Sequence, residues 1–381
     1  MHLIKPHINE KLLHYFYNKE LDELYISVAL KSLAESFVGI FVPIYLLTLG
    51  FDIRLLVIYY AIYFLSIVFF MILGMKLNSS IGVKKTMSLW ILFFVIYFLS
   101  LHSFGITMPY IIALIWWAAV ALYYASFHIE FSKFTAKNKE ATQFSILKII
   151  TIVASIVWPL LGALFIEKIS FNFLFILVSV LMLLSIVPLF FTKDIKTEKF
   201  NFSFSKLKKS DSLNKFLVYN IDGVLNLVSG IFWPVFIFIT LKEVFALWVI
   251  VSATSMIMVI FLIIIARLTD KNRDNVFKIW IWSYSVSWIT RLLFLSPIGI
   301  FLNNIYSSLA SLMIEIPFSK MIYQKSKKTV DISHYFLFRE IGLAAGRIIL
   351  LVVVFFVNDI YWAFIIAFFM TFAYFLIMRK K

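Results

Sequence analysis

Long apolar runs, separated by short polar or basic connections, make up most of the chain. Each run has about 19 to 28 residues, enough for a helix to cross roughly 30 Å of hydrocarbon. Backbone groups in lipid need internal hydrogen bonds, and the runs lack the apolar and polar alternation of a membrane β-barrel. We therefore predict twelve membrane-spanning helices, over residues 22–47, 54–75, 86–104, 108–131, 143–166, 170–192, 216–241, 245–266, 275–296, 298–319, 333–357 and 359–378.

The composition is typical of a polytopic membrane protein. Of 381 residues, 62% are hydrophobic, 19% are aromatic and only 14% are charged, and the mean hydropathy is +0.97. A soluble domain carries about 25% charged residues. The first twenty residues are polar, so we expect no cleavable signal sequence and expect the first span to direct insertion.

The position of the positive charges, rather than the net charge of +15, predicts the topology. If both termini lie on one side of the membrane, that side holds 27 of the 35 Lys and Arg residues, and the other side holds only Arg54, Lys168 and Lys242. Short cytoplasmic segments are enriched in Lys and Arg. We therefore expect both termini to be cytoplasmic. Because the positive charges are distributed by side of the membrane, as in other membrane proteins, we expect no nucleic-acid partner.

The chain offers little metal or thiol chemistry. It has no cysteine, which excludes disulfides and a cysteine nucleophile, and its six histidines are scattered without an HExxH pair. We expect no metal site and no cofactor. A membrane enzyme, such as an acyl- or glycosyltransferase, would need a clustered His, Asp or Ser constellation or an exposed catalytic loop, and we find neither.

The sequence contains a repeat with an offset of 191 residues. Pro43 corresponds to Pro234, and Lys148 corresponds to Arg339. A duplication of six spans returns the chain to the same side of the membrane, so the copies are parallel and related by an axis along the membrane normal. We predict an all-α membrane protein built from two pseudo-twofold-related six-helix bundles.

The repeat also predicts the domain organisation. The N-terminal bundle comprises residues 1–192, the cytoplasmic linker 193–215 and the C-terminal bundle 216–381. The linker is the longest polar segment and carries seven Lys residues with interleaved phenylalanines, Phe200, Phe202 and Phe204. The aromatic side chains could rest on the membrane while lysines meet anionic headgroups, but an ordinary flexible linker is the interpretation we favour.

Twelve spans in two halves, a basic central loop, and a charged turn after spans 2 and 8 resemble the major facilitator superfamily of secondary transporters. The signature turn of that superfamily is G-x-L-A-D-R-x-G-R-K/R-K/R. Here the first copy, MKLNSSIGVKK, keeps Leu77, Gly82, Lys84 and Lys85. The second copy, ARLTDKNRDN, keeps Leu268, Asp270, Lys271 and Arg273. The resemblance covers nearly the whole chain and implies transport of a small molecule by alternating access.

The resemblance also implies a cytoplasmic gate. In the superfamily the acid of the turn faces a helix N-terminus of the other half, where an anion is favoured by roughly 0.3 to 1 kcal/mol. Asp270 would thus approach the start of span 5, with Lys148 as charge partner, unless it is a solvated loop acid. Glu340 could pair with Lys148 or form an intrahelical pair with Arg339. The predicted gate residues are Gly82, Lys84, Lys85, Lys148, Asp270, Lys271, Arg273, Arg339, Glu340 and Arg347.

Charged side chains occur inside the first span, in the stretch KSLAE. Lys31 and Glu35 are spaced i, i+4, and the offset of 191 puts Asp222 and Asn226 at the equivalent positions of span 7. This spacing places each pair on one helix face. Charges at membrane depth are costly and tend to face a bundle interior or a water-filled cavity. We predict that they face a central cavity, although Lys31 could instead snorkel to the cytoplasmic surface.

Major facilitators bind substrate near the midplane between their halves, in a cavity lined mainly by spans 1, 4, 7 and 10. Span 4 brings His128 and Glu130 near its cytoplasmic end, and span 10 carries a polar stripe whose serines could be packing residues. Arg291 on span 9 is expected to snorkel outward. The predicted cavity residues are Lys31, Glu35, Tyr124, Asp222, Asn226, Asn304, Ser308, Ser311 and Glu315.

These features predict a monomeric secondary transporter in the lipid bilayer, without an ATP motif. We hypothesise that Glu35 and Glu315 exchange protons, and that Lys31 with Asp222 holds substrate or forms an ion pair that breaks during the cycle. The alternatives are a lipid or lipid-linked saccharide flippase, which the 43 Phe and 18 Tyr would suit, and a transporter-like sensor or accessory subunit. The abundance of Lys, Ile and Phe hints at a prokaryotic gene and a prokaryotic plasma membrane.

Overall fold

The computed structural model describes residues 18–38, 41–48, 50–104, 109–137, 139–169, 171–242, 244–271 and 273–375. Within these ranges all regular secondary structure is helical. The first half of the chain forms α2 (Lys19–Val38), α3 (Phe41–Thr48), α4 (Ile53–Ser80), α5 (Val83–Phe104), α6 (Pro109–Phe134), α7 (Glu140–Lys168), α8 (Phe171–Leu184) and η1 (Val187–Phe190).

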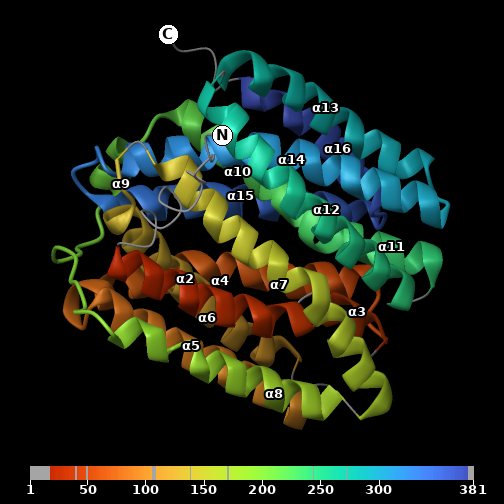
Figure 1. Cartoon of the computed structure of the whole chain (residues 1–381), viewed down its shortest axis with the longest axis horizontal. Helices are drawn as coiled ribbons and strands as arrows, with labels where there is room; N and C mark the ends of the chain where they lie inside the picture. Colours follow the sequence, from red (N-terminus) through yellow and green to blue (C-terminus); the bar gives the residue numbers. More distant parts are fainter. Residues whose placement is uncertain are drawn as a thin grey trace, which may run out of the picture.

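The second half repeats this series of helices after the short α9 (Phe204–Ser210). It forms α10 (Leu213–Leu227), η2 (Val228–Phe232), α11 (Trp233–Leu241), α12 (Val244–Lys271), α13 (Arg273–Leu293), α14 (Pro297–Ser326), α15 (Ile332–Val357), α16 (Tyr361–Thr371) and η3 (Phe372–Tyr374). Figure 1 shows the first half, coloured red to yellow-green, below the second half, which runs from green to blue.

Each of the twelve predicted spans coincides with one helix or with consecutive helical segments. Eight helices in the described part of the chain are long and apolar enough to cross a membrane. Several helices continue past the apolar run, as α4 does to Ser80 and α14 to Ser326. The apolar run marks only the part of a helix that suits lipid, because polar residues can extend the same helix into water.

The seventh span contains a π-helical turn next to its repeated proline. In the first span, α2 ends at Val38 and α3 begins at Phe41, and residues 39–40 lie outside the described part of the structure. In the seventh, a π-helical turn, η2, precedes α11, whose second residue is Pro234. Proline lacks an N–H and its ring clashes with the preceding turn. The helix of the seventh span therefore departs from regular α-helical geometry over Val228–Phe232.

The same helix contacts occur in both halves. In the first half, α2 packs against α7 and α8, α4 against α6, and α5 against α6 and α8. In the second half, α10 packs against α15 and α16, α12 against α14, and α13 against α14 and α16. Each of these contacts has its counterpart in the other half. This correspondence confirms the predicted pair of related six-helix bundles.

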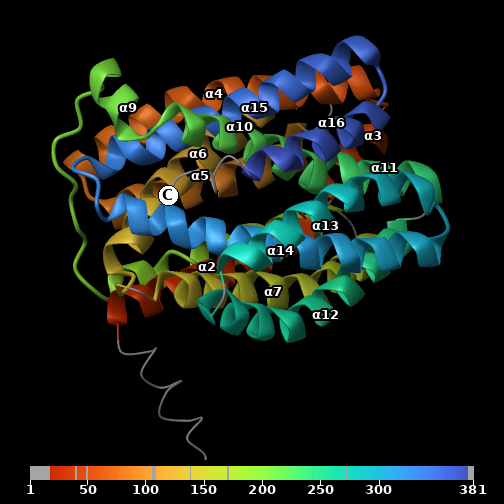
Figure 2. The ribbon, with the colours of Figure 1, turned by 90° about the horizontal axis from the view of Figure 1, so that it is seen from above.

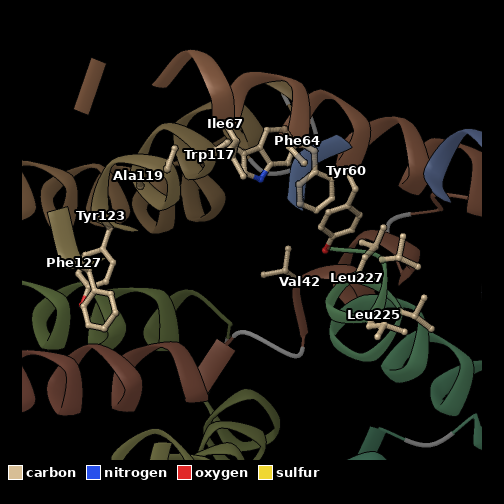
Figure 3. Packing of buried hydrophobic residues seen from close by; sticks show 14 of the residues in the cluster. Val42, Tyr60, Phe64, Ile67, Trp117, Ala119, Tyr123, Phe127, Leu225 and Leu227 are labelled. Carbon is tan, nitrogen blue, oxygen red and sulfur yellow. The ribbon is translucent and has the colours of Figure 1, made fainter. Parts of the chain in front are cut away.

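Two pairs of helices form the most extensive contacts between the halves. Figure 2 shows α4 beside α15 along one edge of the molecule and α7 beside α12 along the other. Between these edges, α6 contacts α15 and α14 contacts α7. A large cluster of buried apolar side chains runs through both halves, and Figure 3 shows part of it, with Phe64 and Trp117 from the first half and Leu225 and Leu227 from α10.

The connection between the halves packs against the bundle. Phe200 is 5% exposed, and its ring centroid lies 4.7 Å from that of His334 in α15. The backbone N–H of Ser203 donates to Nε2 of His334. The segment around Phe200 is therefore anchored, in contrast to the flexible linker that its many lysines led us to expect. We call the end of the molecule that carries α9 and this connection the basic end; α3 and α11 reach the opposite end (Figure 1).

Candidate functional site

A cavity of about 430 Å³ lies between the two halves. Its wall comes from α2, α4, α6 and α7 of the first half and from α10, α14 and α15 of the second. Ligand pockets have volumes of roughly 300 to 1,000 Å³, so this cavity suits a small solute. Its position between related bundles makes both halves part of one site.

The equivalent faces of the first and seventh spans both reach this cavity. Lys31 and Glu35 of α2 line it together with Asp222 and Asn226 of α10. Both i, i+4 pairs therefore border the same cavity, one pair from each half. Other predicted residues that line the cavity are Tyr124, Lys148, Glu315, Arg339, Glu340 and Arg347.

The polar stripe of α14 reaches the cavity only through Glu315. Asn304 is 9% exposed and lies inside the second half, where it accepts a hydrogen bond from Trp233 and donates one to Thr254. Ser308 and Ser311 also lie outside the cavity wall. Residues 304 and 315 share a helix face, but eleven residues separate them by about 16 Å along the axis. The structure therefore places Asn304, Ser308 and Ser311 away from the predicted cavity.

Lys31 is held inside the first half. Its side chain is 5% exposed, and its Nζ lies 2.5 Å from Glu35 Oε1. The same ammonium group stands 4.5 Å from the ring centroid of Tyr123 and 5.8 Å from that of Tyr124. Cation–π contacts of this kind stabilise a desolvated ammonium. These contacts argue against the snorkelling alternative for Lys31.

One ion pair in the cavity joins the two halves. Lys148 of α7 pairs with Glu315 of α14, and the side chains are 29% and 35% exposed. The sequence suggested Asp270 or Glu340 as the partner of Lys148. The side chain of Asp270 lies outside the described part of the structure, as do those of Lys271 and Arg273. Glu340 is paired with its neighbour Arg339 at 2.5 Å.

His128 connects the halves at the basic end of the cavity. Arg339 of α15 donates to its Nε2 at 3.2 Å, so Nδ1 carries the proton and donates to the hydroxyl of Tyr323 at 2.9 Å. The imidazole also stacks on Phe336, with ring centroids 5.0 Å apart. A neutral histidine thus bridges α6, α14 and α15. Sequence reasoning identified His128 as a candidate, but not Tyr323.

A second layer of inter-half contacts lies closer to the basic end. The hydroxyls of Ser132 and Ser326 are 2.6 Å apart. Lys327, which follows α14, donates to the backbone oxygen of Thr135 at 2.7 Å and lies 2.9 Å from Oε1 of Glu140. The sequence analysis did not predict the side chains of Ser132, Glu140, Ser326 and Lys327. Only their positions at the ends of spans 4, 5 and 10 could have indicated them. Together with His128 they close the cavity toward the basic end.

The signature turn of the first half does not take part in this closure. Gly82 has φ of +115°, which favours glycine. Asp194 accepts hydrogen bonds from the backbone N–H groups of Lys84 and Lys85, and so caps α5. The Lys84 side chain is 1% exposed and lies 2.6 Å from Glu23 Oε2. Glu23 belongs to the first half and Asp194 to the connection, so none of these contacts joins the two halves. The contacts give the turn a packing role, whereas we predicted it as part of the gate.

Arg291 is buried, contrary to our expectation that it snorkels outward. It is 3% exposed, and its guanidinium carbon lies 4.6 and 4.2 Å from the rings of Trp233 and Trp288. One of its nitrogens donates to Ser307 at 2.7 Å. Stacking on two indoles suits the planar guanidinium.

In the described residues, no three His, Cys, Asp or Glu side chains form a group that could hold a metal ion.

Comparisons with solved structures identify the fold. A POT family transporter in complex with 5-aminolevulinic acid has a TM-score of 0.71 at 12% identity, covering 95% of this chain and 96% of that one. For the E. coli fucose:proton symporter the TM-score is 0.67 at 12% identity, with 95% and 98% covered. The human organic anion transporter MFSD10 gives 0.65 at 11% identity, with 93% and 99% covered. The chain has the major facilitator fold.

This likeness is one of structure rather than sequence. No protein-family profile matches the chain, and no curated protein matches it in sequence. In the major facilitator fold, α2, α6, α10 and α14 are the first, fourth, seventh and tenth spans, and all four line the cavity described above. The cavity therefore lies between the four spans that the resemblance to major facilitators implied, and its binding of a substrate stays a prediction.

Proposed function

We propose that the protein is a secondary transporter that moves a small solute across the membrane by alternating access. The observation that carries this proposal is the charged cavity between two related bundles, closed toward the basic end by contacts between the halves. Rocking of the halves would break those contacts and expose the same side chains on the other side of the membrane. The transporters with the same fold support this reading.

Coupling to protons would act through the ion pair of Lys148 and Glu315. Protonation of Glu315 removes its negative charge and therefore removes one link between α7 and α14. Glu35 could accept a proton in the same way, which would release Lys31 within the first half. We propose that these two carboxylates are the proton-exchanging groups. Lys31 and Asp222 then belong to the substrate-binding surface or to an ion pair that forms during the cycle.

The remaining parts of the proposal concern orientation and assembly. Because Lys and Arg are concentrated there, we propose that the basic end and both termini face the cytoplasm. The transporter would then be closed to the cytoplasm in this structure. We further propose a monomer in a prokaryotic plasma membrane, without enzymatic activity and without a nucleic-acid partner. The domain limits at residues 192 and 216 stay a prediction.

Solute uptake by reconstituted protein tests the proposal. Purified protein in liposomes is offered labelled amino acids, dipeptides, nucleosides, sugars and organic anions under an imposed pH gradient. We expect one class to accumulate above protein-free liposomes, and Glu315→Gln and Glu35→Gln to lose the dependence on the gradient. Glu198→Gln, which changes an exposed acid of the connection, is the matched control. Failure of every class to accumulate, or uptake in Glu35→Gln and Asp222→Asn that equals that of the wild type in rate and in dependence on the gradient, would count against it.

A further inference from the structure

The charges that line the cavity are balanced in number. Four basic and four acidic side chains contribute to its wall, and His128, whose Nε2 accepts a hydrogen bond, adds none. Three pairs are already formed among them, namely Lys31 with Glu35, Lys148 with Glu315, and Arg339 with Glu340. Asp222 and Arg347 are left over.

Neither of these two residues forms a salt bridge in the described part of the structure. One carboxylate oxygen of Asp222 accepts a hydrogen bond from the hydroxyl of Tyr374 at 3.1 Å. The guanidinium carbon of Arg347 lies 4.8 Å from the ring centroid of Phe64. Neither contact is an ion pair, although Arg339 and Arg347 are close enough to attract the Asp222 carboxylate electrostatically. Both side chains are partly exposed, and both line the cavity.

Close packing of α10 against α15 fixes where the two charges stand. A Cβ on Gly346, next to Arg347, would lie 1.9 Å from the backbone oxygen of Asn220. A Cβ on Gly223, next to Asp222, would lie 2.2 Å from the backbone oxygen of Leu343. The backbones of the two helices therefore touch beside both residues. A negative and a positive group are held on adjacent helices of one rigid half, in a preorganised arrangement.

From this arrangement we infer that the cavity selects zwitterions, small solutes that carry both an ammonium and a carboxylate group. The inference rests on the proposed transport function and specifies its substrate class. The ammonium group would approach Asp222, and the carboxylate would accept hydrogen bonds from the guanidinium fork of Arg347. The apolar part of the solute would lie against Tyr124, Phe127 and Met71, which share the wall.

Solutes with a single charge fit this site less well. A bound anion would compensate Arg347 but leave Asp222 unpaired, and a bound cation would do the reverse. An unpaired charge in a partly desolvated site is costly. A solute without charge compensates neither residue. A zwitterion satisfies both and leaves the cavity with no net charge.

Equilibrium binding to purified full-length protein in detergent tests this inference. The probes are phenylalanine, N-acetylphenylalanine, which is an anion, phenylalanine amide, which is a cation, and leucine with the same two derivatives. We expect the free amino acids to raise the unfolding temperature at millimolar concentration, and each capped derivative to bind at least about tenfold more weakly, which corresponds to 1.4 kcal/mol. Equal or tighter binding of a capped derivative, or no binding of either amino acid, would overturn the inference.

Two variants assign the charges to the residues. In Asp222→Asn, the preference for phenylalanine over N-acetylphenylalanine should disappear, and in Arg347→Gln the preference over the amide should disappear. Arg54→Gln, which removes an exposed arginine far from the cavity wall, should keep both preferences. Because the readout is a ratio of affinities in one folded variant, a loss of stability does not imitate it. Unchanged preferences in the first two variants would contradict the assignment.

Binding and flux separate this inference from the proposed function. If amino acids bind but are not carried across liposomes, the substrate class stands and the transport proposal fails. If another class is transported and neither amino acid binds, the transport proposal stands and the zwitterion class is wrong.

Discussion

The hydroxyl groups of Ser132 and Ser326 lie 2.6 Å apart, although one belongs to α6 of the first half and the other ends α14 of the second. Both residues are buried, at 1% and 2% exposure. The contact lies between the cavity and the basic end, in the same layer as the ion pair of Lys327 and Glu140. If the halves rock apart at this end, the two hydroxyls must separate.

This contact predicts a cross-link that stops transport. The chain has no cysteine, so Ser132→Cys with Ser326→Cys introduces the only thiols. We expect an oxidant to join them, because their side-chain atoms already touch and disulfides need closely spaced Cβ atoms. Uptake should stop on oxidation and return with a reductant. Mass spectrometry of the digested protein measures the cross-link, and liposome uptake measures its effect.

A pair within one half provides the control for this cross-link. Ser126 of α6 donates to Asn78 of α4 at 2.8 Å, and both belong to the first half. Asn78→Cys with Ser126→Cys should also cross-link, but uptake should continue. Full uptake with the Ser132→Cys and Ser326→Cys cross-link complete would show that the halves do not separate at the basic end.

The ion pair of Lys148 and Glu315 predicts a rescue by charge exchange. Lys148→Glu or Glu315→Lys alone places like charges together between α7 and α14, so each should lower the stability of the closed state. The double variant restores the pair with its signs exchanged. Because both side chains are about one third exposed, solvent screens the pair, and we expect a coupling energy of only about 1 kcal/mol.

Thermal unfolding of the four proteins measures this coupling. A cysteine at position 326 in each background gives an independent readout, since maleimide should label it faster in the two single variants than in the wild type or the double variant. Strictly additive effects of the two substitutions would show that the pair does not hold the halves together.

Much of the fold could be predicted because it depends on local pattern and on repetition. The length of each apolar run specifies a spanning helix, and the offset between Pro43 and Pro234 reveals the duplication before any contact is known. Helix ends and breaks were harder to predict. The π-helical turn η2 lies directly before α11 and Pro234, but no single residue type marks such a turn.

The candidate site was predictable where a residue's depth and helix face suffice to place it. Lys31 and Glu35 reach the cavity because they lie deep in α2 on one face. Partners were not predictable, because Glu315 meets Lys148 only through the packing of α14 against α7. Asn304 was assigned to the cavity from helical spacing alone. That spacing gives the face of α14 but not which stretch of its length meets the opening.

From the close packing at Gly346 we predict that adding a methyl group at this position lowers stability. In Gly346→Ala the new Cβ would lie 1.9 Å from the backbone oxygen of Asn220, so α10 and α15 must move apart. Overpacking of this kind costs about 1 to 3 kcal/mol. Gly230→Ala is the control, because a Cβ there meets nothing within 4 Å. Thermal unfolding should separate the two variants, and equal unfolding temperatures would rule out tight packing at Gly346.

From its contacts we predict that Asp331 makes a pH-dependent contribution to stability. It caps α15 by accepting from the backbone N–H of His334, and it also contacts the His334 ring and Lys206. Burial alone would raise its pKa, but these bonds together lower the pKa below 3.8. Since the folded-state pKa is depressed, the ionised carboxylate stabilises the protein above the unfolded-state pKa, and this contribution is lost as the pH falls through the folded-state value.

Two substitutions separate the charge of Asp331 from its capping role. Asp331→Asn keeps an oxygen for the cap but loses the charge, so it should be less stable than the wild type at pH 7 and approach it well below pH 3.8. Asp331→Ala loses the cap as well and should cost about 1 kcal/mol more. Thermal unfolding across this pH range measures both. A difference in stability between the Asp331→Asn variant and the wild type that does not change with pH would contradict the prediction.

From the surroundings of Arg291 we predict that Arg291→Met, which removes the charge, lowers the free energy of unfolding less than Arg291→Lys, which keeps the charge on an ammonium group. Its Nε and one Nη have no hydrogen-bond partner among the described residues, so part of its charge is uncompensated. Arg291→Lys places a compact, strongly hydrated ammonium between Trp233 and Trp288, where it cannot stack on both indoles. Arg291→Met fills similar volume without a buried charge, which is often neutral or stabilising. We expect Lys to lower the free energy of unfolding by about 1 to 2 kcal/mol and Met to lower it less. A larger loss for Met than for Lys would show that the positive charge itself is required inside this half.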